Sequence, residues 1–138
     1  MSPPPFFDTN VVLYAFTPSG DKTLTAERIL LEGGVVSVQV LNELTSVSRS
    51  KFKMNWSEVG LVIQGTTIMC PDPKALTFET FLEARRISEQ YGFSIWDGLI
   101  LASALGAGCT TLYTEDLQHG QVVDGVRIEN PFLQPASP

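Results

Sequence analysis

The chain has 138 residues, of which 43% are hydrophobic and 17% are charged, as in one folded domain with a sizeable core. This composition excludes an intrinsically disordered chain, which combines low hydrophobicity with high net charge. Fifteen acidic residues against nine basic ones give a formal net charge of −6, which argues against nucleic-acid binding that depends mainly on basic side chains. It leaves open a nucleic-acid enzyme whose carboxylates bind divalent cations, because these cations reverse the charge that a phosphate meets.

The two cysteines, Cys70 and Cys109, are far apart, and the sequence has no CxxC motif. We therefore expect reduced structural thiols and a cytoplasmic protein. Residues 1–5 form a proline-rich leader without the basic and apolar regions of a signal peptide. The longest weakly polar stretch, residues 98–108, is too short to span a bilayer. We expect a single domain over residues 1–138, with a leader at 1–5, a tail at 133–138 and no membrane contact.

Short apolar strands alternate with helices along the chain. Apolar or β-rich runs predict strands at about Phe6, Val35–Val36, Cys109–Tyr113 and Val126–Glu129, the last after an Asp-Gly hairpin turn. Helical periodicity and breaks at glycine or proline predict helices over residues 10–16, 25–32, 37–50, 56–69, 77–90 and 94–105. This alternation predicts an α/β fold, a three-layer α/β/α sandwich with a mainly parallel central sheet.

Four carboxylates lie where an apolar element begins or ends. Asp8 directly follows the first strand, and Glu43 lies at the edge of the apolar stripe of its helix. Asp97 is in the first turn of an apolar helix, and Asp116 follows a later strand. Each also has an ordinary structural explanation. Asp8 or Asp97 could cap a helix, Glu43 could extend to solvent from the edge of the buried helix face, and Asp116 could be a turn residue.

Taken together, these four carboxylates predict a metal site. In a parallel sheet, residues that follow strands or open the next helix project at one edge. Carboxylates without basic partners repel one another there, and Mg²⁺ or Mn²⁺ relieves that repulsion. Such a site suits hydrolysis of a phosphodiester: one metal lowers the pKa of an attacking water, and a second, about 4 Å away, stabilises the leaving oxygen.

These residues also give the sequence a resemblance to a known family. Asp8-Thr9-Asn10, Glu43, Asp97 and Thr114-Glu115-Asp116 resemble the four acidic positions of PIN-domain ribonucleases, especially the VapC-type toxins of bacterial toxin–antitoxin pairs. The resemblance extends from Phe6 to about Phe132, and it depends on the order and spacing of the motifs as well as on chain length.

The resemblance implies a metal-dependent endoribonuclease that is often a homodimer and is inhibited by an antitoxin bound over the acidic cleft. The four acids would be the catalytic residues and the Mg²⁺ or Mn²⁺ ligands, with Asp8 and Asp97 the firmest of them. Three neighbouring polar side chains would orient the carboxylates: Thr9, Asn10 and Thr114. The low basic content departs from the stronger positive surface that many ribonucleases display.

A small basic cluster ends the helix predicted over residues 37–50. Arg49, Lys51 and Lys53, interleaved with Phe52 and Trp56, could contact RNA through phosphates and stacked bases. A solvated helix end explains the same residues equally simply.

Two further features have both a functional and a structural interpretation. His119, the only histidine, could assist proton transfer or be an ordinary surface turn residue. The helix over residues 77–90 carries a stripe of Phe78, Phe81 and Leu82, which we interpret as core. Part of this stripe could instead serve a dimer or antitoxin interface.

Three other functions compete with the nuclease. A phospho-signalling receiver domain needs paired acids after its first strand and a lysine after its fifth, and no lysine follows Lys74. A haloacid-type phosphatase needs Asp-x-Asp, but residue 10 is asparagine. A PIN fold that acts only as a nucleic-acid or protein-binding module is the main alternative, although all four acids are present.

Overall fold

Two fully buried phenylalanines form β1 (Phe6–Phe7), the first strand of the sheet. The structure is a computed structural model that describes residues 2–133. β1 pairs in parallel with β2 (Thr111–Tyr113), and β2 pairs in parallel with β4 (Val126–Glu129). β3 (Val122–Val123) pairs antiparallel with β4. The strand order is β1-β2-β4-β3, which confirms the predicted, mainly parallel sheet.

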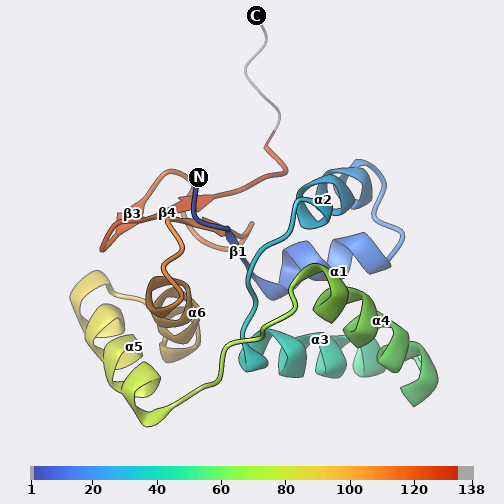
Figure 1. Cartoon of the computed structure of the whole chain (residues 1–138), viewed down its shortest axis with the longest axis horizontal. Coiled ribbons are helices and arrows are strands. Elements are labelled where there is room, and N and C mark those ends of the chain that lie inside the picture. Colours follow the sequence, from blue (N-terminus) through green and yellow to red (C-terminus); the bar gives the residue numbers. More distant parts are fainter. Residues whose placement is uncertain (1, 134–138) are drawn as a thin grey trace, which may run out of the picture.

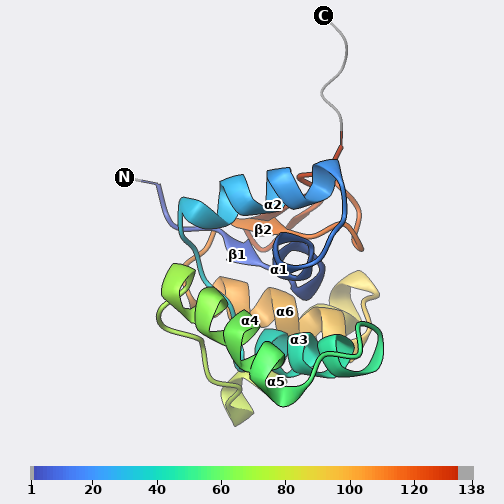
Figure 2. The same cartoon turned by 90° about the vertical axis from the view of Figure 1, so that its right-hand side faces the viewer.

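Helices cover both faces of this sheet. Their bounds are α1 (Thr9–Phe16), α2 (Asp21–Leu31), α3 (Val38–Ser50), α4 (Trp56–Met69), α5 (Phe78–Tyr91) and α6 (Ile95–Gly106). Figure 1 shows α5 and α6 packed side by side, with α1 and α2 on the opposite side of the molecule. In Figure 2 the strands lie between α2 and the group α3–α6, which confirms the three-layer arrangement. Within residues 2–133 no helix is both long and apolar enough to cross a bilayer.

Polar side chains fix the helix starts close to where the sequence predicts them. Ser37 caps α3 by accepting from the Val40 amide, and Thr77 caps α5. Asn55 and Glu58 form a capping box at the start of α4. α2 begins at Asp21, ahead of the apolar periodicity that starts at residue 25, and Gly20 precedes it without a side-chain cap.

The strand predicted at Val35–Val36 is wrong in extent. Val35 forms a single parallel bridge with Phe6, and no named strand covers this segment. Ser37 forms a separate parallel bridge with Lys74 and also caps α3, so the chain enters the helix before the pairing with β1 can extend. The bridge still places the start of α3 beside β1.

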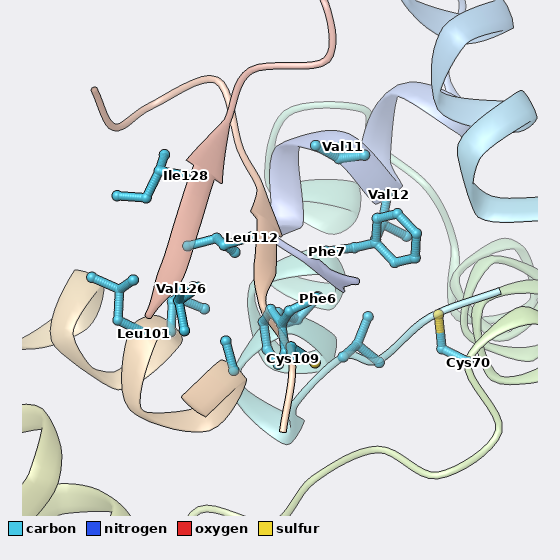
Figure 3. Close-up of a cluster of buried hydrophobic side chains, with 14 of the residues drawn as sticks. Phe6, Phe7, Val11, Val12, Cys70, Leu101, Cys109, Leu112, Val126 and Ile128 are labelled. Atoms are coloured by element: carbon cyan, nitrogen blue, oxygen red, sulfur yellow. The ribbon is translucent and has the colours of Figure 1, made fainter. Parts of the chain in front are cut away.

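The core gathers around the strands, where Phe6, Phe7, Leu112 and Ile128 are all fully buried (Figure 3). Full burial of such a side chain stabilises a fold by about 1.5–3 kcal/mol. Gly34 is needed for this packing, because a Cβ there would lie 2.2 Å from the Phe7 ring and 2.7 Å from the Pro5 carbonyl oxygen. The end of β1 is therefore tightly packed, and this fixes the position of Asp8, the residue that follows it.

The interpretation of the α5 stripe as core is wrong. Phe78, Phe81 and Leu82 are exposed by 68%, 42% and 47%, whereas Ala84 and Ile87 of the same helix are fully buried. α5 contacts the rest of the molecule mainly through α6, and Ala84 and Ile87 are its buried residues, whereas Phe78, Phe81 and Leu82 face outward. The two phenylalanine rings stack on each other at 6.3 Å.

Candidate active site

The carboxyl ends of β1 and β2 meet at one edge of the sheet. The Asp8 amide donates to the Tyr113 carbonyl at 3.0 Å, and the Thr114 amide donates to the Glu129 carbonyl at 3.0 Å. These bonds continue the parallel pairing for one residue past each strand. Asp8 and Thr114 therefore lie side by side, as expected for residues that follow neighbouring parallel strands.

Asp8 is a buried carboxylate without a basic partner. It is 7% exposed; its Oδ1 accepts from the Thr9 amide at 2.7 Å, and its Oδ2 accepts from the Thr114 hydroxyl at 2.9 Å. Burial raises its pKa to about 6, although both hydrogen bonds favour the charged form. The nearby carboxylates of Glu43 and Asp116 contribute a smaller part of this rise in pKa. Asp8 also caps α1, so the structural and functional interpretations are compatible.

Thr9 connects Asp8 to Glu43. Its amide binds Asp8, while its hydroxyl donates to Glu43 Oε2 at 2.7 Å. Glu43 is half-buried, and its other oxygen accepts from Gln39 Nε2 at 2.8 Å. The Gln39 amide nitrogen also donates to the Trp96 carbonyl at 3.2 Å. The sequence places Glu43 at the edge of an apolar stripe, and in the structure its carboxylate is held there by two neutral donors, Thr9 and Gln39.

Asn10 joins Asp116 to Thr114, whose hydroxyl binds Asp8. Its Nδ2 donates to Asp116 Oδ2 at 3.0 Å and to the Thr114 hydroxyl oxygen at 3.2 Å. The Asp116 amide also donates to that hydroxyl oxygen, at 3.1 Å. Asp116 is exposed, so its carboxylate remains open to solvent.

Asp97 lies apart from the other three acids. Its amide donates to Ser94 Oγ at 3.2 Å, so Ser94 is the residue that caps α6. In the described part of the chain no hydrogen bond joins its carboxylate to Asp8, Glu43 or Asp116. Among residues 2–133, the one hydrogen-bonded link from Glu43 toward Asp97 runs through Gln39 to the carbonyl of Trp96, the residue before Asp97.

The donor chemistry of this site fits a hard divalent cation. All candidate donors are oxygens, and in residues 2–133 no basic side chain forms an ion pair with any of the four acids. Among those residues, however, no three acids, histidines or cysteines are grouped closely enough to hold a metal ion. Three acids share one hydrogen-bond network and Asp97 lies outside it, so the donor atoms suit a hard cation but do not enclose a single metal position.

Glu115 does not join this group, although it is adjacent to Asp116 in sequence. Its carboxylate accepts from the Tyr14 hydroxyl and from Lys22 Nζ, the latter at 2.8 Å. Burial opposes its ionisation, but the ammonium and phenol outweigh burial and hold its pKa below the usual value. Glu115 is therefore an ionised carboxylate whose charge is balanced by Lys22, next to the site.

The basic cluster of Arg49, Lys51 and Lys53, which we call the basic edge, lies at the end of α3 and in the turn that follows it. The Arg49 guanidinium lies 4.7 Å from the centre of the Trp56 ring and donates to the Met54 carbonyl at 2.9 Å. Lys51 lies over the ring of Phe52 at 5.6 Å. Lys53 has a positive φ of 55°, in the turn that follows α3.

His119 has a structural contact. Its Nδ1 accepts from the Asn130 amide at 3.0 Å, and its side chain is exposed. It therefore helps to fix the segment between β2 and β3 against the end of β4, and proton transfer by His119 stays a prediction.

Sequence reasoning missed two residues that shape the site. Gln39 is polar but falls on the covered side of α3, a pattern that could have identified it. Gly98 follows Asp97 directly; a Cβ there would lie 2.1 Å from Ser88 Oγ and 2.6 Å from the Ala84 carbonyl oxygen. Its missing side chain sets how closely the first turn of α6 approaches α5, and so where Asp97 lies.

Known proteins support the same fold. The PIN domain profile matches residues 6–124. No curated protein sequence matches the chain significantly. A chain of a toxin–antitoxin complex from Klebsiella pneumoniae superposes with a TM-score of 0.72 at 15% identity, covering 92% of this chain and 97% of that one.

Two further solved structures agree. VapC20 of Mycobacterium tuberculosis, a toxin that cleaves the sarcin–ricin loop, gives a TM-score of 0.65 at 14% identity, over 81% of this chain and 91% of its own. VapBC2 of Rickettsia felis, solved with a promoter DNA fragment, gives 0.65 at 19% identity, over 91% and 97%. With a profile match over most of its length and the fold of these structures, the chain belongs to the PIN domain family.

Proposed function

We propose that this PIN-domain protein is a metal-dependent endoribonuclease that hydrolyses RNA phosphodiester bonds. The observation that carries the proposal is the buried Asp8, joined by neutral donors to Glu43 and Asp116 at the edge of the sheet. Uncompensated carboxylates of this kind bind Mg²⁺ or Mn²⁺. The structural similarity to VapC20, a toxin that cleaves the sarcin–ricin loop, supports the same choice of substrate.

Each acid has a distinct task in this proposal. Asp8 is the firmest ligand, because Thr9 and Thr114 hold its two oxygens in place. Asp97 is the second ligand, while Glu43 and Asp116 complete the site directly or through water. Bound divalent metal would supply a lowered pKa for an attacking water and a stabilised leaving oxygen. Thr9, Asn10 and Thr114 keep the carboxylates oriented and ionised by directing donors at them.

The RNA strand would run from the acids toward the basic edge. Arg49 lies six residues after Glu43 on α3, or about 9 Å along a helix that rises roughly 1.5 Å per residue. We propose that Arg49, Lys51 and Lys53 contact phosphates and that the exposed Trp56 ring stacks on a base. The acidic surface elsewhere would keep non-specific RNA binding weak.

A toxin role within a toxin–antitoxin pair is the biological form of this proposal. Two of the structural relatives are described as toxin–antitoxin assemblies, which supports a small antitoxin protein as partner and a cytoplasmic setting. We also propose a homodimer, since Phe78, Phe81 and Leu82 expose a contiguous run of apolar side chains on α5. The chain would act as one domain over residues 1–138.

The experiment is an RNA-cleavage assay on chain purified free of any antitoxin. We expect cleavage of an RNA pool with Mg²⁺ or Mn²⁺ and none with chelator. If the protein binds metal yet cleaves no RNA, the alternative gains: a PIN fold that only binds nucleic acid or protein. The toxin role has a separate test, growth arrest on expression together with a small open reading frame directly upstream. If both are absent, the toxin role is withdrawn and the nuclease can stand.

A further inference from the structure

Gln39 lies between the two separated parts of the acidic site. It is 4% exposed and lies one helical turn before Glu43 on α3. Its Nε2 donates to Glu43 Oε1 at 2.8 Å and to the Trp96 carbonyl at 3.2 Å. No other hydrogen bond within residues 2–133 connects Glu43 to the start of α6, which carries Asp97.

The orientation of the Gln39 amide follows from its partners. A carboxylate oxygen and a backbone carbonyl can only accept, so the NH₂ group must face both of them. Both of its protons are thereby used, and the Oε1 atom is left buried without a partner. Three side-chain polar atoms in the described residues are in this condition, and only Gln39 Oε1 belongs to a side chain bonded to an acid of the site.

A buried acceptor without a partner destabilises a fold, and native structures leave few of them. An ion or water absent from the protein alone is a usual reason for such an atom. Gln39 has the further property of joining two candidate ligands through its amide. Gln39 Oε1 is therefore a buried acceptor, next to the amide nitrogen that binds Glu43, that can accept a hydrogen bond from a further donor.

We propose that Gln39 is a positioning residue of the metal site. Its NH₂ group holds Glu43 at a fixed separation from the first turn of α6, and its Oε1 accepts a hydrogen bond from water carried by the bound cation. Gln39 acts through Glu43 and Asp97 and does not itself touch RNA. This inference rests on the proposed metal-dependent function.

The first test uses Gln39→Met, which keeps the length of the side chain and removes its hydrogen bonds. Mn²⁺ binding is measured by isothermal titration calorimetry on the metal-free protein. We expect the dissociation constant to rise by about 10–100-fold, as for other partners that orient metal ligands. Gln64→Met, on the exposed face of α4, is the matched control and should leave the constant within about twofold of wild type.

A Gln39→Met constant within the control range overturns the assignment of Gln39 and leaves the proposed function intact. If the wild-type chain binds no Mn²⁺, the proposed function fails and this inference fails with it. The two failures are therefore distinguishable.

A second variant guards against a loss that comes only from misfolding. Gln39→Glu keeps the shape but replaces the donor with a carboxylate beside Glu43, so we expect a lower melting temperature in chelator. Mn²⁺ should then raise the melting temperature of Gln39→Glu by more than that of wild type, because the added charge attracts the cation. An equal rise in both proteins would mean that Gln39 has only a packing role and would overturn the proposal.

Discussion

The hydroxyl of Thr114 donates to Asp8 Oδ2 at 2.9 Å across 106 residues of sequence. The same oxygen accepts from Asn10 Nδ2 and from the Asp116 amide, so its own proton can point only at Asp8. Thr114 is fully buried, which leaves no water to replace these bonds. One hydroxyl thus fixes the direction of three neighbouring groups at the site.

Thr114→Val tests this role. Valine has a similar shape but leaves a buried carboxylate and two donors without their partner, so we expect the free energy of unfolding to fall by about 1–3 kcal/mol. Mn²⁺ affinity should fall by about 10–100-fold. Thr114→Ser keeps the hydroxyl and should retain most of both quantities, measured by denaturant unfolding and calorimetry. A valine variant that matches the serine variant in Mn²⁺ affinity would contradict the role.

The raised pKa of Asp8 predicts a pH dependence of stability in the metal-free protein. The folded chain holds the Asp8 proton up to a pKa of about 6, while the ordinary value is 3.8. Between these values the folded state binds more protons than the unfolded state, so stability falls as the pH rises through this window. The shift of about two units corresponds to a loss of about 3 kcal/mol, complete above the folded pKa.

Asp8→Asn removes that titration. In chelator, the stability of the variant relative to wild type should improve steadily as the pH rises from about 4 to 7. Urea unfolding at a series of pH values measures it. Asp72→Asn is the control, because the carboxylate of Asp72 is largely exposed and pairs only with Lys74. A constant difference between Asp8→Asn and wild type over this range would show that Asp8 is ionised throughout.

Gly98→Ala should impair activity without changing any acid. The added Cβ meets the Ala84 carbonyl and the Ser88 hydroxyl oxygen, which should push the first turn of α6 away from α5 and move Asp97 with it. Overpacking of this kind costs about 1–3 kcal/mol, and a displacement of about 1 Å at a catalytic group can lower the rate by roughly 100-fold. Gly106→Ala is the control on the same helix, since a Cβ there meets nothing within 4 Å. Cleavage rates and melting temperatures that are equal in the two variants would contradict the prediction.

Phe81→Glu tests the proposed dimer. The side chain is 42% exposed on α5 and stacks with Phe78, so a charge there should disrupt an apolar interface while leaving the fold intact. We expect the concentration at which dimers dissociate to rise by at least about tenfold, since burying an unpaired charge is costly. Light scattering coupled to size exclusion measures it. Leu61→Glu, on the exposed surface of α4, should leave dimerisation unchanged. The proposed surface is wrong if both variants dimerise like wild type.

The sequence was sufficient to predict the parts of the fold and site that depend on local pattern. The alternation of strands and helices predicts a parallel sheet, and residues such as Asp8 and Thr114 that follow its strands must then share one edge. Helix starts were predicted well because Ser37, Asn55 and Ser94 are short polar side chains that cap their own helices.

Features that depend on long-range contacts could not be predicted in this way. Periodicity identified the apolar stripe with Phe81 but not what covers it, and here Ala84 and Ile87 are the buried residues of α5, which packs mainly on α6. Lys22 neutralises Glu115 across 93 residues, so adjacent acids in the sequence have different charge environments in the fold. The contact of Gln39 with the carbonyl of Trp96 likewise spans 57 residues.

The central claim is that these carboxylates support hydrolysis of RNA by water. Its most direct test is cleavage of a defined RNA in ¹⁸O-labelled water with Mg²⁺, followed by mass spectrometry of the first-formed ends. The proposal predicts one ¹⁸O atom on the new terminal phosphate, no 2′,3′-cyclic phosphate, and loss of at least about 99% of the activity in Asp97→Asn. Cyclic phosphate ends without label, or equal cleavage by Asp97→Asn, would contradict it.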